Sequence, residues 1–319
     1  MTRVLVTGAT GFIGSRLCEA LASSGYIVRA ALRTDRSVPV SIAEKIIVGD
    51  MNSTTDWTRA LDGVDAVIHT AARAHVLNAL PGTADLYFET NERGTQCLAA
   101  AAAQAKVTRF VFLSSIKANG EESASGAYAS GDVPHPQDDY GLSKWRAEQH
   151  LIEIARRTGM EAVIVRPPLV YGPGVRANFL RLLQWVDSGW PLPFGAVRNL
   201  RSLVSVWNLC DLLLLLLKHP NAPGHTWMVS DGEDLSTPAL IRRIATALNR
   251  RAHLIFVPLR LLQFAAALMG RRGEMARLSG SLAVDITPTR TQLGWSPRTS
   301  VDEGLARTAA WYLAQKARR

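Results

Sequence analysis

In the first half of the chain, apolar residues occur in short runs that are rich in Val, Ile and Phe and do not alternate strictly with polar residues. Such runs are typical of strands buried on both faces, as in a parallel sheet. Helical stretches, such as 15–25 and 94–105, separate them. This order predicts an α/β fold with a doubly wound parallel sheet. The expected strands span residues 3–8, 27–33, 45–50, 66–72, 109–115 and 161–168.

The pattern changes at Tyr171, where a stretch rich in Gly and Pro begins. A return strand is expected at 201–208, and from about residue 233 the chain is helical and polar. This predicts a sheet domain and a smaller, mostly helical C-terminal lobe, with a ligand cleft between them. The sheet domain would comprise residues 1–170 and about 203–232, and the lobe residues 171–202 and 233–319.

Two longer apolar segments fall short of the roughly 20 apolar residues that a membrane span requires. Residues 209–217 are too few and include Asp211, whereas residues 254–270 include Pro258 and Arg260. Both are interpreted as core or domain-interface helices, so no integral membrane span is expected. Because "GRRGEMAR" comes directly after the second segment, peripheral contact with a membrane surface stays open for it.

The composition of the 319 residues, 47% hydrophobic and 20% charged, is that of a soluble globular protein. Cys18, Cys97 and Cys210 are scattered and odd in number, which argues against a disulfide framework or a zinc site and fits a reducing compartment. No metal is expected. The N-terminus enters a strand at once, without a signal peptide, so a cytoplasmic location is expected.

The net charge of +9 and the pI of about 9.9 suit an anionic partner. The basic residues are dispersed, however, and neither a nucleic-acid motif nor a basic patch interleaved with aromatic residues is present. A negatively charged small substrate accounts for the charge equally well, and no nucleic-acid partner is expected.

Three glycines, Gly8, Gly11 and Gly14, lie where the first strand meets the first helix. Glycines at this junction allow a tight turn and a close backbone approach, so that the helix N-terminus can hold a pyrophosphate, as in Rossmann folds. The spacing differs from G-x-G-x-x-G, but its place in a strand–helix pattern predicts a dinucleotide site.

The end of the second strand bears on the choice of cofactor. Folds that prefer NAD usually offer an acidic residue there for the ribose 2′-hydroxyl. This chain has Leu32 and Arg33, with Arg36 nearby. Since a guanidinium pairs well with a 2′-phosphate, NADP(H) is favoured and NAD(H) is possible. The alternative is that Arg33 is a solvated charge and another group binds the ribose.

The helix expected at 138–151 places Tyr140 and Lys144 one turn apart on the same face. Taken alone, such a pair is a weak surface contact. An ammonium group beside a phenol favours phenolate, however, and would lower the tyrosine pKa from ~10. Ser115 ends the strand at 109–115, at the carboxyl edge where doubly wound sheets bind ligands.

The segments "TGATGFIG", "GDM", "HTAA", "NERGT", "FLSS", "YGLSK" and "RPPLVYGPG" occur in the order seen in extended short-chain dehydrogenases/reductases, the NAD-dependent epimerase/dehydratase family. The resemblance covers most of the chain. Within the family the chain is most similar to nucleotide-sugar 4-epimerases and 4-ketosugar reductases of polysaccharide biosynthesis, including that of lipopolysaccharide. The resemblance implies an enzyme with a nicotinamide cofactor and a UDP-sugar substrate.

The resemblance also implies roles for individual residues. Tyr140 would be the proton donor or acceptor, Lys144 its electrostatic partner and a ligand of the nicotinamide ribose, and Ser115, rather than Ser114, the hydroxyl that orients the substrate. The implied cofactor-binding residues are Gly8, Thr10, Gly11, Phe12, Ile13, Gly14, Arg33, Arg36, Asp50, Met51, Ala71, Ala72, Arg73, Asn91, Ser114, Tyr140, Lys144, Pro167 and Val170.

Several of these roles are specific. Asp50 and Met51 would lie beside the adenine, and Ala71 and Ala72 would let the backbone approach the cofactor. Asn91 would support the geometry of the active site, and residues 167–170 would lie along the nicotinamide.

The implied substrate-binding residues include the stretch "RANF", whose asparagine and adjoining backbone would reach the diphosphate and uracil. Arg201 would bind phosphate, with a second arginine from "GRRGEMAR". For Asn178 and Arg201 the alternatives are a capped helix start and a solvated strand end. The full set is Ser115, Lys117, Asn178, Phe179, Arg201, Arg271 and Arg277.

The two residues directly after Ser115 exclude one of the possible reactions. Related 4,6-dehydratases have an Asp-Glu pair where this chain has Ile116 and Lys117, so dehydration is not expected. Arg33 favours an NADPH-dependent reductase of a UDP-4-keto-6-deoxy-N-acetylhexosamine. The alternative is a 4-epimerase of UDP-hexoses or UDP-N-acetylhexosamines with tightly bound NAD.

Two other classes of protein fit the sequence less well. Superfamily members that bind NADP without turnover typically lose the Tyr or the Lys, which this chain retains. A steroid or flavonoid reductase would not need a cationic C-terminal lobe. The family habit is a homodimer formed through two helices of the sheet domain.

Overall fold

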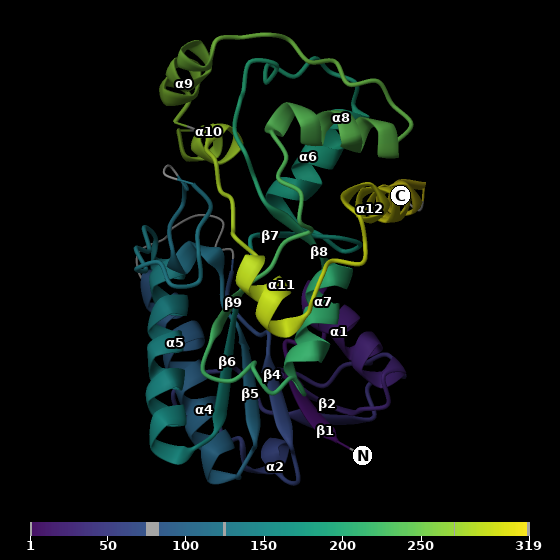
Figure 1. Ribbon diagram of the computed structural model, residues 1–319. Coiled ribbons are helices and arrows are strands. Elements are labelled where there is room, and N and C mark those ends of the chain that lie inside the picture. Colours follow the sequence, from purple (N-terminus) through teal and green to yellow (C-terminus); the bar gives the residue numbers. More distant parts are fainter. Residues whose placement is uncertain (1, 75–82, 124–125, 271, 318–319) are drawn as a thin grey trace.

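The computed structural model describes residues 2–74, 83–123, 126–270 and 272–317, and its centre is a seven-stranded sheet (Figure 1). All neighbouring strands of this sheet run parallel, as the apolar runs predict. In order across the sheet, they are β3 (Glu44–Ile47), β2 (Ile27–Leu32), β1 (Arg3–Thr7), β4 (Ala66–His69), β5 (Arg109–Leu113), β6 (Glu161–Arg166) and β9 (Thr226–Met228).

Helices cover both faces of the sheet: α4 (Gly94–Gln104) and α5 (Asp139–Thr158) lie on one side, and α1 (Phe12–Ser23) and α7 (Val206–Leu216) on the other (Figure 1). The side chains of β5 alternate accordingly. Val111 and Leu113 pack in the core with α1 and α7, whereas Phe110 and Phe112 pack in the core with α4 and α5. Because both faces are buried, the strand sequence is apolar throughout.

The connection after β4 is also helical, and so is most of the C-terminal part. The remaining elements are α2 (Thr58–Leu61), α3 (Thr83–Tyr87), the π-helix η1 (Phe88–Arg93), the 3₁₀ turn η2 (Ile116–Ala118), β7 (Leu169–Tyr171), α6 (Ala177–Asp187), β8 (Leu203–Ser205), α8 (Thr237–Ala247), α9 (Leu259–Leu268), α10 (Arg272–Ser279), α11 (Thr287–Leu293) and α12 (Val301–Ala317).

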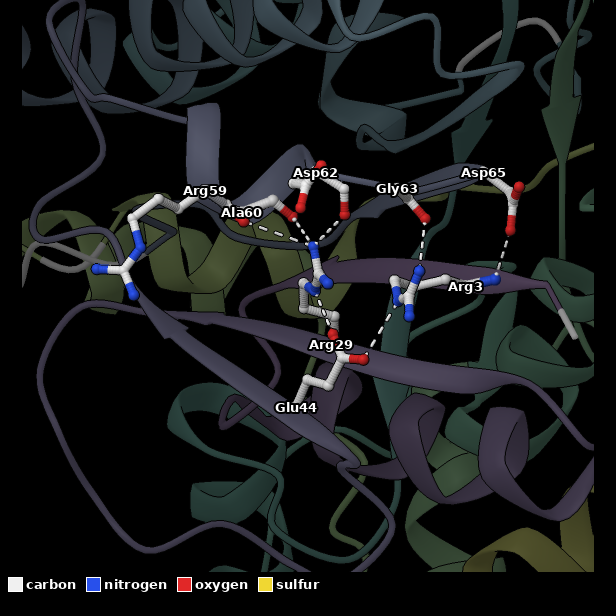
Figure 2. A network of polar contacts seen from close by, with 8 residues as sticks. All are labelled: Arg3, Arg29, Glu44, Arg59, Ala60, Asp62, Gly63 and Asp65. Carbon is white, nitrogen blue, oxygen red and sulfur yellow. Dashed lines mark hydrogen bonds and ion pairs between the residues drawn. The ribbon is translucent and has the colours of Figure 1, made fainter.

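A polar network fastens the edge strand β3 to the start of the sheet (Figure 2). The Glu44 carboxylate accepts hydrogen bonds from Arg29 Nε at 2.5 Å and from Arg3 Nε at 3.2 Å. Arg29 Nη1 also donates to the carbonyls of Ala60 and Asp62 at the end of α2. Partial burial opposes ionisation of Glu44, but the hydrogen bond and charge of Arg29, aided by Arg3, outweigh it and lower the Glu44 pKa.

A second hydrophobic core lies among α6, α8 and α12, with Phe179, Ile241 and Leu305 at its centre. Tyr171 joins this core to the sheet domain: its ring stacks on Phe179, and its hydroxyl donates to Asp231, which lies just after β9, at 2.7 Å. No helix in the described ranges combines the length and the apolar character needed to cross a membrane.

The structure corrects the return strand expected at 201–208. Only Leu203–Ser205 is extended, and this strand pairs in parallel with β7 in a separate two-stranded sheet. Ser205 then caps the N-terminus of α7 by accepting a hydrogen bond from Asn208, so the helix begins where the strand was expected to continue.

Candidate functional site

The glycine turn between β1 and α1 forms one wall of the candidate site. Gly8 has φ +68°, and a Cβ there would lie 2.8 Å from Ala71 N. A Cβ on Gly14 would lie 2.1 Å from Gly8 O, so only glycine lets the helix approach the turn this closely. Gly11 caps α1 without a side-chain hydrogen bond, and the first turn carries no acidic residue. Such an N-terminus suits an anionic ligand.

A buried chain of hydrogen bonds crosses the sheet behind this turn. The Thr7 hydroxyl lies 2.5 Å from His69 Nδ1, and Thr95 Oγ1 lies 2.9 Å from His69 Nε2. Since Thr95 donates its hydrogen to Asn91 O, it accepts from Nε2–H, which makes Nδ1 the acceptor. Burial, aided by the charge of Lys144, lowers the pKa of His69 well below its usual value. A neutral His69 therefore links β1 to the η1–α4 segment.

Asn91 connects the loop after β4 to helix α5. Its side-chain oxygen accepts from Arg73 N at 2.8 Å, and its amide nitrogen donates to Arg73 O and to Ser143 Oγ, both at 3.1 Å. Ser143 immediately precedes Lys144 on α5. The asparagine thus holds this loop and α5 together, and its supporting role at the active site stays a prediction.

Ser115, Tyr140 and Lys144 meet at the carboxyl edge of the sheet. Ser115 lies just after β5, is 9% exposed and hydrogen-bonds to the Tyr140 hydroxyl. Tyr140 lies in the first turn of α5, which Asp138 caps by accepting from Gly141 N at 2.7 Å. Lys144, 1% exposed, places its ammonium nitrogen 4.2 Å from the centroid of the Phe112 ring.

The ionisation of this pair departs from the sequence argument, which expects Lys144 to lower the Tyr140 pKa. Burial instead raises the pKa of Tyr140 to about 12, although the hydrogen bond from Ser115 partly opposes this. Burial lowers the pKa of Lys144 to about 7, against the attraction of Glu148. The prediction is wrong for the protein alone, because desolvation penalises both charged forms more than their neighbours stabilise them.

The site fits a nicotinamide dinucleotide. The glycine turn leaves room for a closely approaching group, and the α1 N-terminus favours its negative charge. Ser114 Oγ, next to Ser115, is buried without a hydrogen-bond partner among the described residues. An unpaired buried hydroxyl is costly, which suits a position that a bound ligand completes.

The residues expected to bind the adenosine lie near the carboxyl ends of β1, β2 and β3. Arg33 Nη1 lies 3.8 Å from Asp50 Oδ1, with both side chains exposed, and Arg36 donates to Thr10 Oγ1 at 3.4 Å. Met51 packs against Gly94, where a Cβ would lie 2.9 Å from Met51 Cγ. The roles of these residues, and those of Phe12, Ile13, Ala71 and Ala72, stay predictions.

The loop after β6 is joined to the serine segment. Ser114 N donates to Val165 O at 2.8 Å, and Ile116 N donates to Pro167 O at 3.0 Å. Val170, in β7, is partly buried. This places residues 167–170 beside Ser115, where the resemblance expects the nicotinamide.

The residues expected to bind substrate lie in two places. Lys117 Nζ pairs with Glu121 Oε1 and Asp138 Oδ2, each at 2.5 Å, close to Ser115. Arg201 donates to Gly280 O at 3.0 Å. Burial lowers its pKa, the charges of Glu121 and Glu122 oppose this, and the charge of Arg277 adds to it. Arg271 lies outside the described residues.

The stretch "RANF" is split between surface and core. Asn178 is exposed and accepts from Arg181 at 2.5 Å, whereas Phe179 is 1% exposed and stacks on Tyr171. Any contact of Phe179 with a ligand would therefore come from its backbone. Ala177 has φ +50°, a strained conformation for a residue with a Cβ, and such strain concentrates at ligand sites.

Sequence reasoning missed several residues that shape the site. Gly141 lies against the serine segment, where a Cβ would lie 2.5 Å from Lys117 O, so this glycine lets Tyr140 approach Ser115. Glu148 and Arg166 form a buried ion pair behind Lys144, with Arg166 Nε donating to Glu148 Oε1 at 2.9 Å. The glycine after Tyr140 and the histidine that ends a buried strand were available signals.

Comparison with known proteins agrees with this geometry. The profile of the NAD dependent epimerase/dehydratase family matches residues 4–230. The chain is 43% identical to the UDP-glucose 4-epimerase of Vibrio cholerae over 316 residues, covering 97% of this chain and 95% of that protein.

Solved structures share the fold. The chain resembles MoeE5 in complex with UDP-glucose and NAD, with 27% identity, a TM-score of 0.76, and coverage of 99% of this chain and 100% of the other. It also resembles UDP-glucuronic acid 4-epimerase from Bacillus cereus in complex with NAD, with 23% identity, a TM-score of 0.79, and coverage of 98% and 99%. The chain belongs to the NAD dependent epimerase/dehydratase family.

Proposed function

We propose that this protein is a UDP-sugar 4-epimerase that keeps NAD tightly bound. The observation that carries the proposal is the meeting of Ser115, Tyr140 and Lys144 beside the glycine turn, in a chain so similar to a UDP-glucose 4-epimerase. The proposal replaces the NADPH-dependent reductase that Arg33 favours as the leading function. It corresponds to the alternative left open by the sequence.

In this mechanism Tyr140 would accept the proton of the C4 hydroxyl and later return it to the same oxygen, and the configuration would invert because the hydride returns to the opposite face of C4. Ser115 hydrogen-bonds to the same oxygen and holds it near the phenol. Bound NAD would supply the hydride acceptor and donor for C4 and, when oxidised, a positive charge beside the pair. Such charge favours phenolate, which Tyr140 requires because burial raises its pKa to about 12.

The other residues position this pair. Asn91 holds Arg73 and Ser143, so the loop after β4 and helix α5 keep a fixed separation. The Lys144 ammonium would donate a hydrogen bond to a ribose hydroxyl and would also stabilise the phenolate of Tyr140 electrostatically. Gly8, Gly11 and Gly14 would face the pyrophosphate, and Ser114 the nicotinamide end.

We further propose that the substrate-binding lobe comprises residues 171–202 and 233–319, as the sequence predicts. Asn178, Arg201 and Arg277 would bind the UDP moiety. Support comes from the strained Ala177 before Asn178 and from the charge of Arg277, which acts on buried Arg201. A diphosphate neutralises two adjacent guanidinium groups.

A 4-ketosugar reductase is the second candidate, supported by Arg33. Its guanidinium is exposed at the end of β2, where it is free to meet a 2′-phosphate. The nearby Asp50 carboxylate weakens this argument, because it would repel the same phosphate.

The two functions differ in whether they consume cofactor. An epimerase returns the hydride it takes, so it converts UDP-glucose to UDP-galactose without added cofactor and without net NADPH consumption. A reductase consumes NADPH in proportion to product with UDP-4-keto-6-deoxy-N-acetylglucosamine. The experiment is chromatography of UDP-sugars after incubation with the purified protein, with NADPH absorbance followed in parallel. Stoichiometric NADPH loss without epimerisation of UDP-glucose or UDP-N-acetylglucosamine would overturn the proposal.

A further inference from the structure

Helix α9 exposes an apolar face although another of its faces is already packed. Leu262 is buried in the second core, and Ala266 on the same helix is also buried. Leu261, Phe264 and Leu268 are exposed and have the i, i+3, i+7 spacing of a single helix face. Phe264 is 65% and Leu268 73% exposed, so the helix is apolar on two sides but covered on only one.

Exposed apolar side chains also flank the helix in the sequence. Ile255 and Phe256 precede it, with Phe256 71% exposed, and Met269 comes directly after it. Isolated exposed apolar residues are normal on protein surfaces, whereas several on one helix face indicate a binding surface. The α9 patch is defined here as Ile255, Phe256, Leu261, Phe264, Leu268 and Met269.

Helix α9, which carries Leu261, Phe264 and Leu268, lies at an extremity of the molecule. In Figure 1, α9 is at the end opposite the amino edge of the sheet, beside α10 and at the end of a long connection from α8. A surface placed in this way can meet a large flat partner without obstruction from the sheet domain.

The sequence that carries the patch is basic. Residues 249–273 contain five arginines and neither Asp nor Glu. Arg251 and Arg260 are exposed, and Arg260 lies within α9 itself. Apolar side chains flanked by arginines are the pattern of helices that lie at the surface of a bilayer with anionic lipids.

The length of the helix agrees with lying on a membrane and not with crossing it. Ten residues of α-helix extend about 15 Å, half of the hydrocarbon core. Phe and Leu side chains on one face can enter the boundary between headgroups and acyl chains while the arginines contact lipid phosphates.

We propose that the α9 patch docks this protein on the surface of an anionic phospholipid bilayer. The apolar face enters the interface, and Arg251 and Arg260 bind lipid phosphates. Next to α9, α10 leads to Gly280, whose carbonyl accepts from Arg201. Docking therefore brings the arginines expected to bind the substrate diphosphate near the membrane. The docking itself does not depend on which sugar is bound.

The test is co-flotation of the full-length protein with vesicles of phosphatidylglycerol and phosphatidylethanolamine, compared with phosphatidylcholine vesicles, at 0.1 M and about 0.5 M salt. We expect binding to the anionic vesicles that weakens at high salt. The double variant Phe264→Ser/Leu268→Ser should bind roughly tenfold more weakly or worse, because two side chains no longer enter the interface. Arg260→Gln should lower anionic binding several-fold.

The matched control is Val40→Ser/Leu313→Ser, which removes two exposed apolar side chains away from α9. It should bind vesicles as the wild type does, and all variants should retain the wild-type Tm and circular dichroism. No binding of the wild type to anionic vesicles, or equal binding by Phe264→Ser/Leu268→Ser, would overturn the proposal. Light scattering could also overturn it. If the wild type self-associates, Phe264→Ser/Leu268→Ser does not, and neither of these two proteins binds vesicles, the patch joins two copies of the chain.

Discussion

Glu148 lies one helical turn after Lys144 on α5, and both side chains are buried. The carboxylate does not bind the lysine, because Arg166 binds both of its oxygens. Arg166 thereby keeps the Lys144 ammonium available to the active site.

This relationship predicts the effect of Arg166→Met. A buried Glu148 without its partner should destabilise the fold by about 3–5 kcal/mol. The carboxylate should also attract Lys144, lowering turnover. Urea unfolding measures the first effect and steady-state kinetics the second. The double variant Arg166→Met/Glu148→Gln should recover much of both losses, and failure of the second substitution to restore turnover would argue against the competition for Lys144.

Tyr140→Phe should lower turnover by roughly 10²–10⁴-fold, the usual contribution of a positioned proton donor or acceptor. NAD affinity should change little, because the glycine turn is untouched. Isothermal titration and product chromatography measure these quantities. Tyr26→Phe, at the opposite end of the sheet, is the control and should be fully active. Turnover of Tyr140→Phe within threefold of wild type would contradict the assigned role.

Lys144 should make stability depend on pH. Burial lowers its pKa from 10.5 to about 7, so the unfolded chain binds one more proton than the folded chain between these values. The free energy of unfolding should therefore rise with pH across this window, and the cost of burying the amine should be largest below pH ~7. Lys144→Met lacks this cost, so its Tm should exceed the wild-type Tm at pH 6, with the gap closing by pH ~10. A gap independent of pH would contradict the lowered pKa.

Asn91→Ala should weaken cofactor binding without touching a reacting atom. It removes the hydrogen bonds to the Arg73 backbone and to Ser143, at a cost of about 1–3 kcal/mol in the free energy of unfolding. We expect a higher Kd for NAD and a lower turnover, both partly restored in Asn91→Asp, which keeps the acceptor for Arg73 N. Thr54→Ala, an exposed control, should leave both unchanged. An unchanged NAD affinity in Asn91→Ala would indicate that Asn91 stabilises only the fold.

The local pattern of the sequence predicts the strands of the main sheet that precede residue 170, because a strand buried on both faces needs an apolar run wherever it pairs. The edge strand β9 is only three residues long and was missed, since Trp227 and Met228 fit a helix as well as a strand. The strand expected at 201–208 is shorter in the structure, and its pairing with β7 could not be predicted because it depends on contacts between segments far apart in the sequence.

The sequence identifies candidate site residues that belong to a motif. It does not identify those that only tertiary packing brings to the site. Gly8, Tyr140 and Lys144 belong to recognisable spacings. The pKa of Tyr140 could not be predicted from the adjacent lysine, because it depends on burial by segments as distant as the one that contains Tyr87, whose ring lies 6.1 Å from that of Tyr140. The link from Thr7 through His69 to Thr95 likewise requires three segments to be assembled.

The pairing of β9 with β6 has a consequence for synthesis on the ribosome. The strand β6 is complete at Arg166, but the strand that covers its edge begins only at Thr226. While the intervening residues are translated, β6 offers unpaired backbone groups to other chains. Messages truncated between these two positions therefore yield chains with an open, apolar edge, and such chains aggregate unless a chaperone holds them.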